Sequence, residues 1–280
     1  MPGHVALAKA KPRRRAIRAK SKLRPKSPRR LKRSEPNLRG MSPDWFQRVR
    51  PALPFAVAAI GLAILSQTVV ATTFTRTGVL LCLALPVAAI ALSLRTHRRA
   101  LASFLAALAA PVVLVAVWPA NGKIAAEEEG RRAARAALRY EGVEYVWGGE
   151  SSRDIDCSGL IRRAYIDAAL DTAWKDTSPA HLRRALLWWW RDTTARNFEN
   201  HAPVNGVRLA ARPNLTGELP AELRAGDLAV VSSGLHVLMY LGDRRWIQAD
   251  PSAHRVLVNA PGSGSNTWLN GPAVLLRPKL

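Results

Sequence analysis

Cysteine is scarce in this chain, and acidic residues are almost missing from its first 122 positions. Among 280 residues there are only two cysteines, Cys82 and Cys157. Cys82 lies inside an apolar run and Cys157 lies far along the chain, so a framework of disulfides is excluded. The six histidines lack the spacing of metal ligands, and we predict neither a metal nor another cofactor.

The missing acids leave a strongly basic start. Residues 1–50 contain 17 lysines and arginines but two acids, a net charge of +15, whereas residues 123–280 have a net charge of only +3. A basic segment rich in Pro and Ser buries too little apolar surface to order itself, so we predict a disordered arm. Its basic runs lack interleaved aromatic residues and any folded motif. The predicted partner is therefore an anionic membrane leaflet, and nucleic acid is disfavoured.

Three long apolar runs follow the arm. They span residues 54–74, 78–94 and 101–118, and each is near the ~20 residues that a helix needs to cross a bilayer. None of the runs has a polar face, which disfavours core helices of a soluble protein. The region 51–122 is therefore predicted to form about three transmembrane helices.

The basic residues beside these runs predict an orientation. The arm places the N-terminus in the cytoplasm, Thr75-Arg76-Thr77 reads as a nearly uncharged outer turn, and residues 95–99 form a basic inner turn. The third helix then runs outward. Residues 123–280 are predicted to form a domain outside the cytoplasm.

The pattern of this last domain changes from helices to strands. We expect helices at 127–140, 159–170 and 181–191, a loop at 142–158, and strands at 227–232, 236–241 and 245–249. Helices followed by strands predict an α+β domain with helices packed on an antiparallel sheet.

One cysteine has the surroundings of a nucleophile. Cys157 lies at the first turn of a predicted helix, directly after Asp156, a good capping residue. Backbone N–H groups and the helix dipole then favour the thiolate. The small Ser158 and Gly159 leave room for a substrate carbonyl, and the N–H of Cys157 could hold an oxyanion.

A base and an orienting group are found on two predicted strands. His236 begins one strand and Gln248 lies on the next, across a tight turn. His236 could take the thiol proton, while Gln248 bonds the other ring nitrogen and sets the tautomer. Asp250 and His254 are alternatives for this third position.

These motifs together carry a resemblance to a known family. Tyr145-x-Trp-Gly-Gly, then Asp156-Cys157-Ser158-Gly159-Leu160, Ala-Gly-Asp-Leu at 225–228 and a strand opening His236-Val resemble the NlpC-type bacterial cell-wall cysteine peptidases. The likeness covers about residues 125–260. It implies a papain-like domain with Cys157 as nucleophile and His236 as base. Gln248 falls where the family most often has His, and Tyr145 matches the family's tyrosine that helps to orient the substrate or the oxyanion.

The predicted function combines the membrane segment with this domain. We predict a cysteine endopeptidase of the bacterial inner membrane that hydrolyses amide bonds in peptidoglycan stem peptides outside the cytoplasm. A thiol-dependent amidase or acyltransferase, and an inactive wall-binding module, are the alternatives. The stretch 171–222, which contains Trp188-Trp189-Trp190, matches no family motif and leaves the substrate specificity open.

Overall fold

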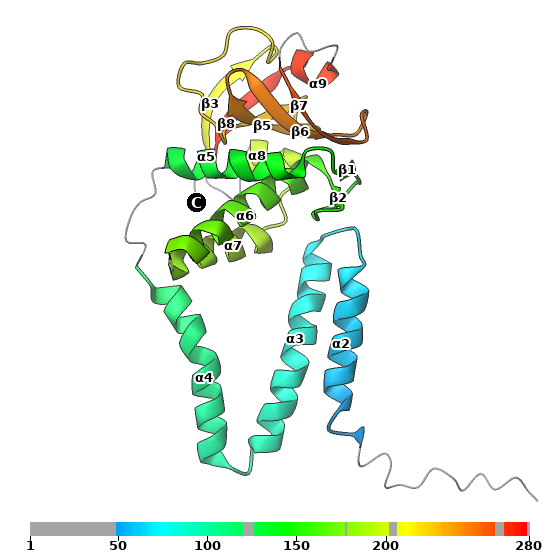
Figure 1. Ribbon diagram of the computed structural model, residues 1–280, viewed down its shortest axis with the longest axis vertical. Helices are drawn as coiled ribbons and strands as arrows, with labels where there is room; N and C mark the ends of the chain where they lie inside the picture. Colours follow the sequence, from blue (N-terminus) through cyan, green and yellow to red (C-terminus); the bar gives the residue numbers. More distant parts are fainter. Residues whose placement is uncertain (1–48, 120–125, 177, 202–205, 261–265, 279–280) are drawn as a thin grey trace, which may run out of the picture. The chain divides into compact units, whose positions relative to one another are not determined.

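The computed structural model describes residues 49–119, 126–176, 178–201, 206–260 and 266–278. All but the last two residues of the predicted basic arm lie outside this part of the chain. Residues 47–280 form one compact unit, in which three apolar helices precede a domain of helices and strands (Figure 1).

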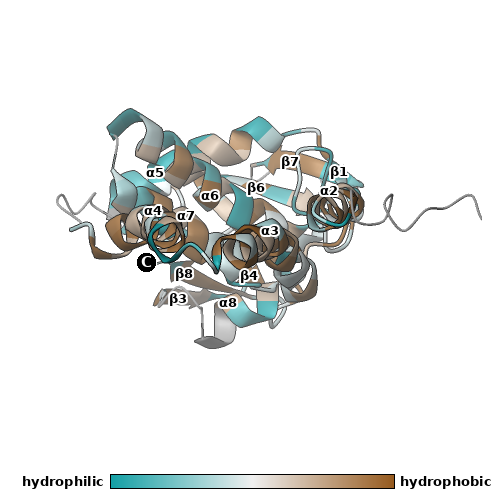
Figure 2. Ribbon diagram, turned by 90° about the horizontal axis from the view of Figure 1, so that it is seen from below, coloured by the Kyte–Doolittle hydropathy of each residue, from teal (hydrophilic) through white to brown (hydrophobic). Residues whose placement is uncertain are grey.

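The three apolar helices are α2 (Leu53–Ser66), α3 (Thr73–Leu94) and α4 (Arg98–Val117). With 22 and 20 residues, α3 and α4 are long and apolar enough to cross a membrane, whereas α2 has only 14 residues. Figure 2 views these helices from below, and hydrophobic colouring predominates on them. Large apolar side chains are exposed on all three, among them Ile60, Ile64, Phe74, Leu81, Leu92, Val112 and Val117. Helices of a soluble core would bury such side chains.

Two predictions for this region are wrong in detail. The first apolar run extends to residue 74, but α2 ends at Ser66. The turn predicted at Thr75-Arg76-Thr77 is already helical, because Thr72 caps α3 in a reciprocal capping box with Thr75. The chain therefore turns over residues 67–72, and Arg76 lies in the first turn of α3.

The C-terminal domain is built on one eight-stranded sheet. Its strands are β1 (Glu144–Tyr145), β2 (Asp154–Ile155), β3 (Val207–Arg212), β4 (Leu228–Val231), β5 (His236–Gly242), β6 (Arg245–Asp250), β7 (Arg255–Asn259) and β8 (Ala273–Arg277). They follow the order β2-β1-β7-β6-β5-β4-β8-β3, and neighbours are antiparallel except β1 with β2. The predicted mixed fold with an antiparallel sheet is confirmed.

Helices pack on this sheet. They are α5 (Ala126–Ala137) with a short extension η1 (Leu138–Tyr140), α6 (Cys157–Asp176), α7 (Pro179–Trp190), α8 (Ala195–His201) and α9 (Thr267–Asn270). The predicted helices at 127–140 and 181–191 and the three predicted strands are confirmed within about two residues. Helix α6 starts two residues earlier and ends six residues later than predicted. It contacts α5, α7 and β5, and so lies at the centre of the domain.

The unassigned stretch 171–222 forms part of this domain. It contains the end of α6, then α7, α8 and β3. Trp188 belongs to the core, because only 1% of it is exposed and its ring stacks on Tyr165 at 4.6 Å. Arg183 of α7 donates hydrogen bonds to the carbonyls of Val115 and Ala116 at the end of α4. This stretch therefore joins the apolar helices to the domain.

Candidate active site

A capped helix start presents Cys157. Asp156 accepts hydrogen bonds at Oδ1 from the Gly159 N–H and from the Ser158 hydroxyl at 2.9 Å, and at Oδ2 from the Gly148 N–H at 2.9 Å. The predicted cap is confirmed. A Cβ on Gly159 would lie only 2.2 Å from the Gly149 carbonyl oxygen, so glycine is required for this close approach. The loop before the helix is thereby held against its first turn.

The thiol of Cys157 is protonated in this environment. Burial raises its pKa to about 12, and the neighbouring Asp156 carboxylate adds to the rise. Backbone N–H groups of Val237, Ser158 and Cys157 itself lower the pKa, as the helix start predicts, but by less. Removal of the sulfur from water thus opposes the effect of the helix start, which favours the thiolate.

His236, the candidate base, begins a chain of hydrogen bonds between side chains. Nε2 of His236 lies 2.7 Å from Oε1 of Gln248, and Nε2 of Gln248 donates to Oδ1 of Asn259 at 2.7 Å. With its amide oriented in this way, Gln248 offers only an acceptor to the ring, so Nε2 of His236 carries the proton and Nδ1 keeps a lone pair. The ring also stacks on Trp268 at 4.3 Å.

His236 is an uncharged imidazole near neutral pH. Burial lowers its pKa to about 4, although the hydrogen bond to Gln248 and the charges of Asp250 and Asp156 oppose the shift. The ring is 2% exposed. A neutral ring with a free lone pair has the protonation state required of a general base.

The structure also places the alternatives to Gln248. Asp250 is buried, but its carboxylate accepts hydrogen bonds from the Ser252 N–H and the Asn266 amide. His254 is exposed. Gln248 is thus the side chain that bonds the His236 ring.

A cleft of about 470 Å³ opens at Cys157. Tyr145, Trp147 and Ser158 line it together with the thiol. Burial, and then the charges of Cys157 and Asp156, raise the pKa of Tyr145 to about 12, so its hydroxyl is a proton donor. The hydroxyl of Ser158 is occupied by Asp156. Of the five predicted site residues, Cys157, Tyr145 and Ser158 line this cleft, and His236 and Gln248 are joined to each other by a hydrogen bond.

His236 is not among the residues that line the cleft, but its chain neighbour Leu235 is. Over the described ranges no hydrogen bond joins the thiol to the ring. The link is instead the N–H of Val237, the residue after His236, which bonds the sulfur. The strand that begins with His236 therefore reaches the sulfur of Cys157.

Comparison with known proteins identifies the domain. A family model described as the NlpC/P60 family matches residues 142–269. The C-terminal domain is an NlpC/P60 domain. Members of this family are cysteine peptidases and related hydrolases that act on peptidoglycan. The match begins 20 residues after the last residue of the predicted membrane region.

Solved structures similar to this chain share little sequence identity with it. NlpC2 from Trichomonas vaginalis is 22% identical, with a TM-score of 0.36, over 54% of this chain and 46% of its own. The peptidoglycan hydrolase RipB from Mycobacterium tuberculosis is 22% identical, with a TM-score of 0.35, over 55% and 67%. The NlpC/p60 domain of the peptidoglycan hydrolase SagA is 24% identical, with a TM-score of 0.29, over 52% and 97%. The chain spans less than half the length of the Trichomonas proteins, and no curated protein matches it.

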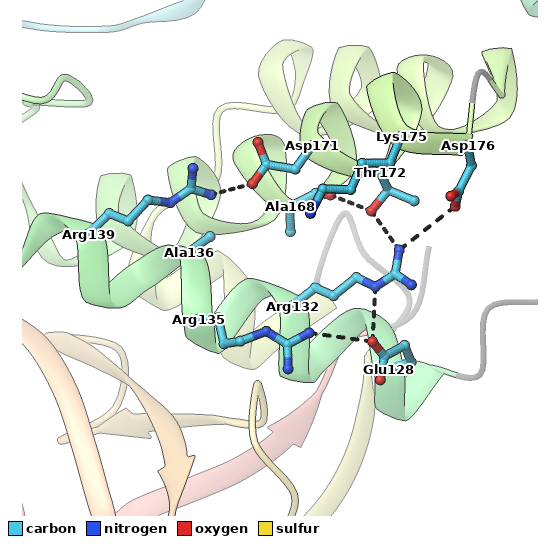
Figure 3. Close-up of a pocket in the computed structure, with 10 residues that line it drawn as sticks. All are labelled: Glu128, Arg132, Arg135, Ala136, Arg139, Ala168, Asp171, Thr172, Lys175 and Asp176. Atoms are coloured by element: carbon cyan, nitrogen blue, oxygen red, sulfur yellow. Dashed lines mark hydrogen bonds and ion pairs between the residues drawn. The ribbon is translucent and has the colours of Figure 1, made fainter.

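A second cavity of the NlpC/P60 domain lies between α5 and α6 (Figure 3). Its volume is about 330 Å³, and no cysteine, serine or histidine lines it. The arginines along it are paired with carboxylates: Arg132 and Arg135 with Glu128, and Arg139 with Asp171. This groove holds no cysteine and its arginines are paired with carboxylates, so the cleft at Cys157 is the candidate active site.

Some neighbours of the site escaped sequence analysis. Asn259 and Trp268 complete the surroundings of His236, and Val70 and Arg162 line the cleft. The position of Asn259 follows from strand register, since Leu257 pairs with Gln248 and Asn259 is its diagonal neighbour. No sequence signal marks Val70, which lies outside the family match.

Proposed function

We propose that this protein is a membrane-anchored cysteine peptidase that hydrolyses amide bonds in peptidoglycan stem peptides. One observation carries the proposal. A cysteine at a capped helix start lies in an open cleft, beside a strand whose buried histidine has its tautomer set by Gln248. Membership of the NlpC/P60 family supports the substrate class.

The protonation states define the order of events. The thiol and the imidazole are both neutral at rest, so the Cys157 proton passes to Nδ1 of His236 as the sulfur attacks the amide carbonyl. The carbonyl oxygen becomes an oxyanion, for which the N–H of Cys157 and the Tyr145 hydroxyl are the available donors. His236 then protonates the leaving nitrogen, and the C–N bond breaks to give a thioester.

Water completes the reaction. His236 removes a proton from a water molecule that attacks the thioester carbon, the C–S bond breaks, and the proton returns to the sulfur. The products are a carboxylic acid and a free amine. Gln248 keeps Nε2–H hydrogen-bonded throughout, so the ring accepts and returns the proton only at Nδ1.

Digestion of purified peptidoglycan tests this function. The full-length chain in detergent or nanodiscs should release new free amines, and Cys157→Ala should abolish the release. Cys82→Ala, which changes the only other cysteine, is the matched control and should keep the activity. Hydrolysis that survives Cys157→Ala contradicts the thiol mechanism. Release of intact stem peptides from the glycan would instead indicate the amidase alternative.

The domain arrangement is a further part of the proposal. We propose a cytoplasmic arm (1–50), a membrane region (51–122) and an extracytoplasmic enzyme (123–280). This arrangement predicts that the exposed Lys175 faces the outside of the cell. In a chain lacking both Cys82 and Cys157, a membrane-impermeant maleimide should label Lys175→Cys on intact cells and Ser27→Cys only after lysis. The reverse pattern contradicts the proposed orientation.

A further inference from the structure

The turn between α2 and α3 reaches the active-site cleft. The N–H of Ala71 donates to the Gly148 carbonyl at 2.9 Å, and Val70 forms an isolated antiparallel bridge with Gly149. Val70, Ala71 and Thr72 line the same cleft as Cys157. They precede the family match by 70 residues or more, so the apolar helices contribute to a site that the family domain alone does not complete.

The contact is close on both sides. A Cβ on Gly148 would lie 2.7 Å from Cγ1 of Val70, so the valine occupies the space that a side chain would fill. Val70 is nevertheless 44% exposed. It therefore packs on the loop before Cys157 while part of its surface faces open space.

A buried ion-pair cluster holds this turn in place. Arg76, 3% exposed, pairs with Glu150 in the loop before the nucleophile, and Glu150 also accepts from Arg162 of α6 at 3.1 Å. Asp192 lies 3.9 Å from Arg76 and 3.6 Å from Arg162. Arg162 further donates to the Thr193 carbonyl. Arg76 is thereby tied to the helix that carries Cys157.

Such a cluster sets position rather than adding much stability. Removing charges from water is costly, and a buried pair offsets that cost only in good geometry. In the observed position of the turn, Arg76 in the first turn of an apolar helix reaches the Glu150 carboxylate. The ion pairs therefore favour this position of the turn between α2 and α3 over other positions.

We propose that Val70–Thr72 form a wall of the substrate cleft that selects which peptides reach Cys157, and that Arg76 is the positioning residue that holds this wall. The identity of the peptide rests on the proposed function, but the wall itself does not. Because the wall narrows the cleft beside the nucleophile, a linear peptide should enter more readily than a branched, cross-linked one.

Thiol chemistry tests the wall without any substrate. In the full-length Cys82→Ala chain, Cys157 is alkylated by a small reagent, iodoacetamide, and by a bulky biotin-maleimide. Val70→Ala and Arg76→Gln should raise the bulky-to-small rate ratio by about threefold to tenfold, since each opens the wall. Arg95→Gln, at the exposed far end of α3, should leave the ratio unchanged. Arg76→Lys, which keeps the charge, should restore most of the wild-type ratio.

Peptide kinetics give the second readout. Val70→Ala should raise KM for a linear stem peptide by up to about tenfold with kcat nearly unchanged, and should improve relative cleavage of cross-linked peptides. The inference would be overturned if wild type, Val70→Ala and Arg76→Gln had equal bulky-to-small rate ratios while thermal melting showed that each protein is folded. If Cys157→Ala leaves peptide hydrolysis intact while the reagent ratio still changes, the proposed function fails and the wall stands.

Discussion

The protein contains two buried polar clusters of different chemistry. The first is a neutral hydrogen-bonded chain from His236 through Gln248 to Asn259, which lies on three neighbouring strands beside Cys157. The second is charged, and joins Arg76 of α3 to Glu150 and Arg162.

The difference teaches what each kind of bond is suited to. Neutral hydrogen bonds with defined donors and acceptors set where a proton sits, which a general base requires. Ion pairs attract over longer distances and from several directions, so they bring separate chain segments together. The neutral cluster sets the position of a proton, whereas the charged cluster sets the position of chain segments. Each prediction below breaks one cluster and leaves the other.

Loss of the base should have the largest effect. His236→Ala removes the acceptor of the thiol proton, so kcat/KM for a stem peptide should fall by about 10²- to 10⁴-fold. The fold should survive, because the charged cluster is untouched. His254→Ala, at an exposed histidine, is the control and should retain activity. Near-normal turnover by His236→Ala would contradict the assigned role.

Removing the central carboxylate should mainly reduce stability. Glu150→Gln leaves Arg76 and Arg162 buried, with the more distant and more exposed Asp192 as the remaining carboxylate beside them. The free energy of unfolding should fall by about 3–5 kcal/mol, as when one partner of a buried pair is removed. Glu141→Gln, at an exposed position, should cost far less. Equal denaturation curves for the two variants would show that the charged cluster does not hold the turn.

Acid should destabilise the neutral cluster. The pKa of His236 falls from 6.5 to about 4 on folding, so below pH ~6.5 the unfolded chain binds a proton that the folded chain does not. Stability should therefore fall as the pH drops from about 6.5 to about 4, by an amount of order 3 kcal/mol. His236→Gln should flatten this limb of the unfolding curve measured against pH, and His254→Gln should not. An unchanged limb in His236→Gln would assign the dependence to other groups.

The orienting residue should have the smallest of these effects. Gln248→Ala leaves Nε2–H of His236 and Oδ1 of Asn259 without their buried partner. Activity should fall by about 10- to 100-fold, the cost of an unsatisfied buried group. Asp250→Asn is the informative comparison, because Asp250 is the alternative third residue. If Asp250→Asn lost more activity than Gln248→Ala, Asp250 and not Gln248 would be the third residue of the site.

Much of the site could be predicted from local sequence. A capping residue directly before Cys157 marks a helix start, and the structure confirms it through the bonds of Asp156. The two strands and tight turn that carry His236 and Gln248 follow from apolar alternation, and the ring and the amide meet at 2.7 Å. These features were accessible because they depend on neighbours within a few residues or on one hairpin.

The state of the thiol could not be predicted in this way. A helix start lowers the pKa of Cys157, and that local effect is present. Burial by packed neighbours raises the pKa further, and burial depends on the whole fold. The proposed order of proton transfer changes as a consequence.

By itself, the sequence determined the apolar helices, the helix and strand pattern of the domain, and the motifs around Cys157 and His236. Periodicity, capping and composition are local properties, so they can be read along the chain. Only the tertiary structure decided that Val70 and Arg76 meet the cleft and that Asn259 completes the chain from His236. Those contacts join segments far apart in sequence, and their geometry is set by packing, burial and charge pairing, which no local pattern encodes.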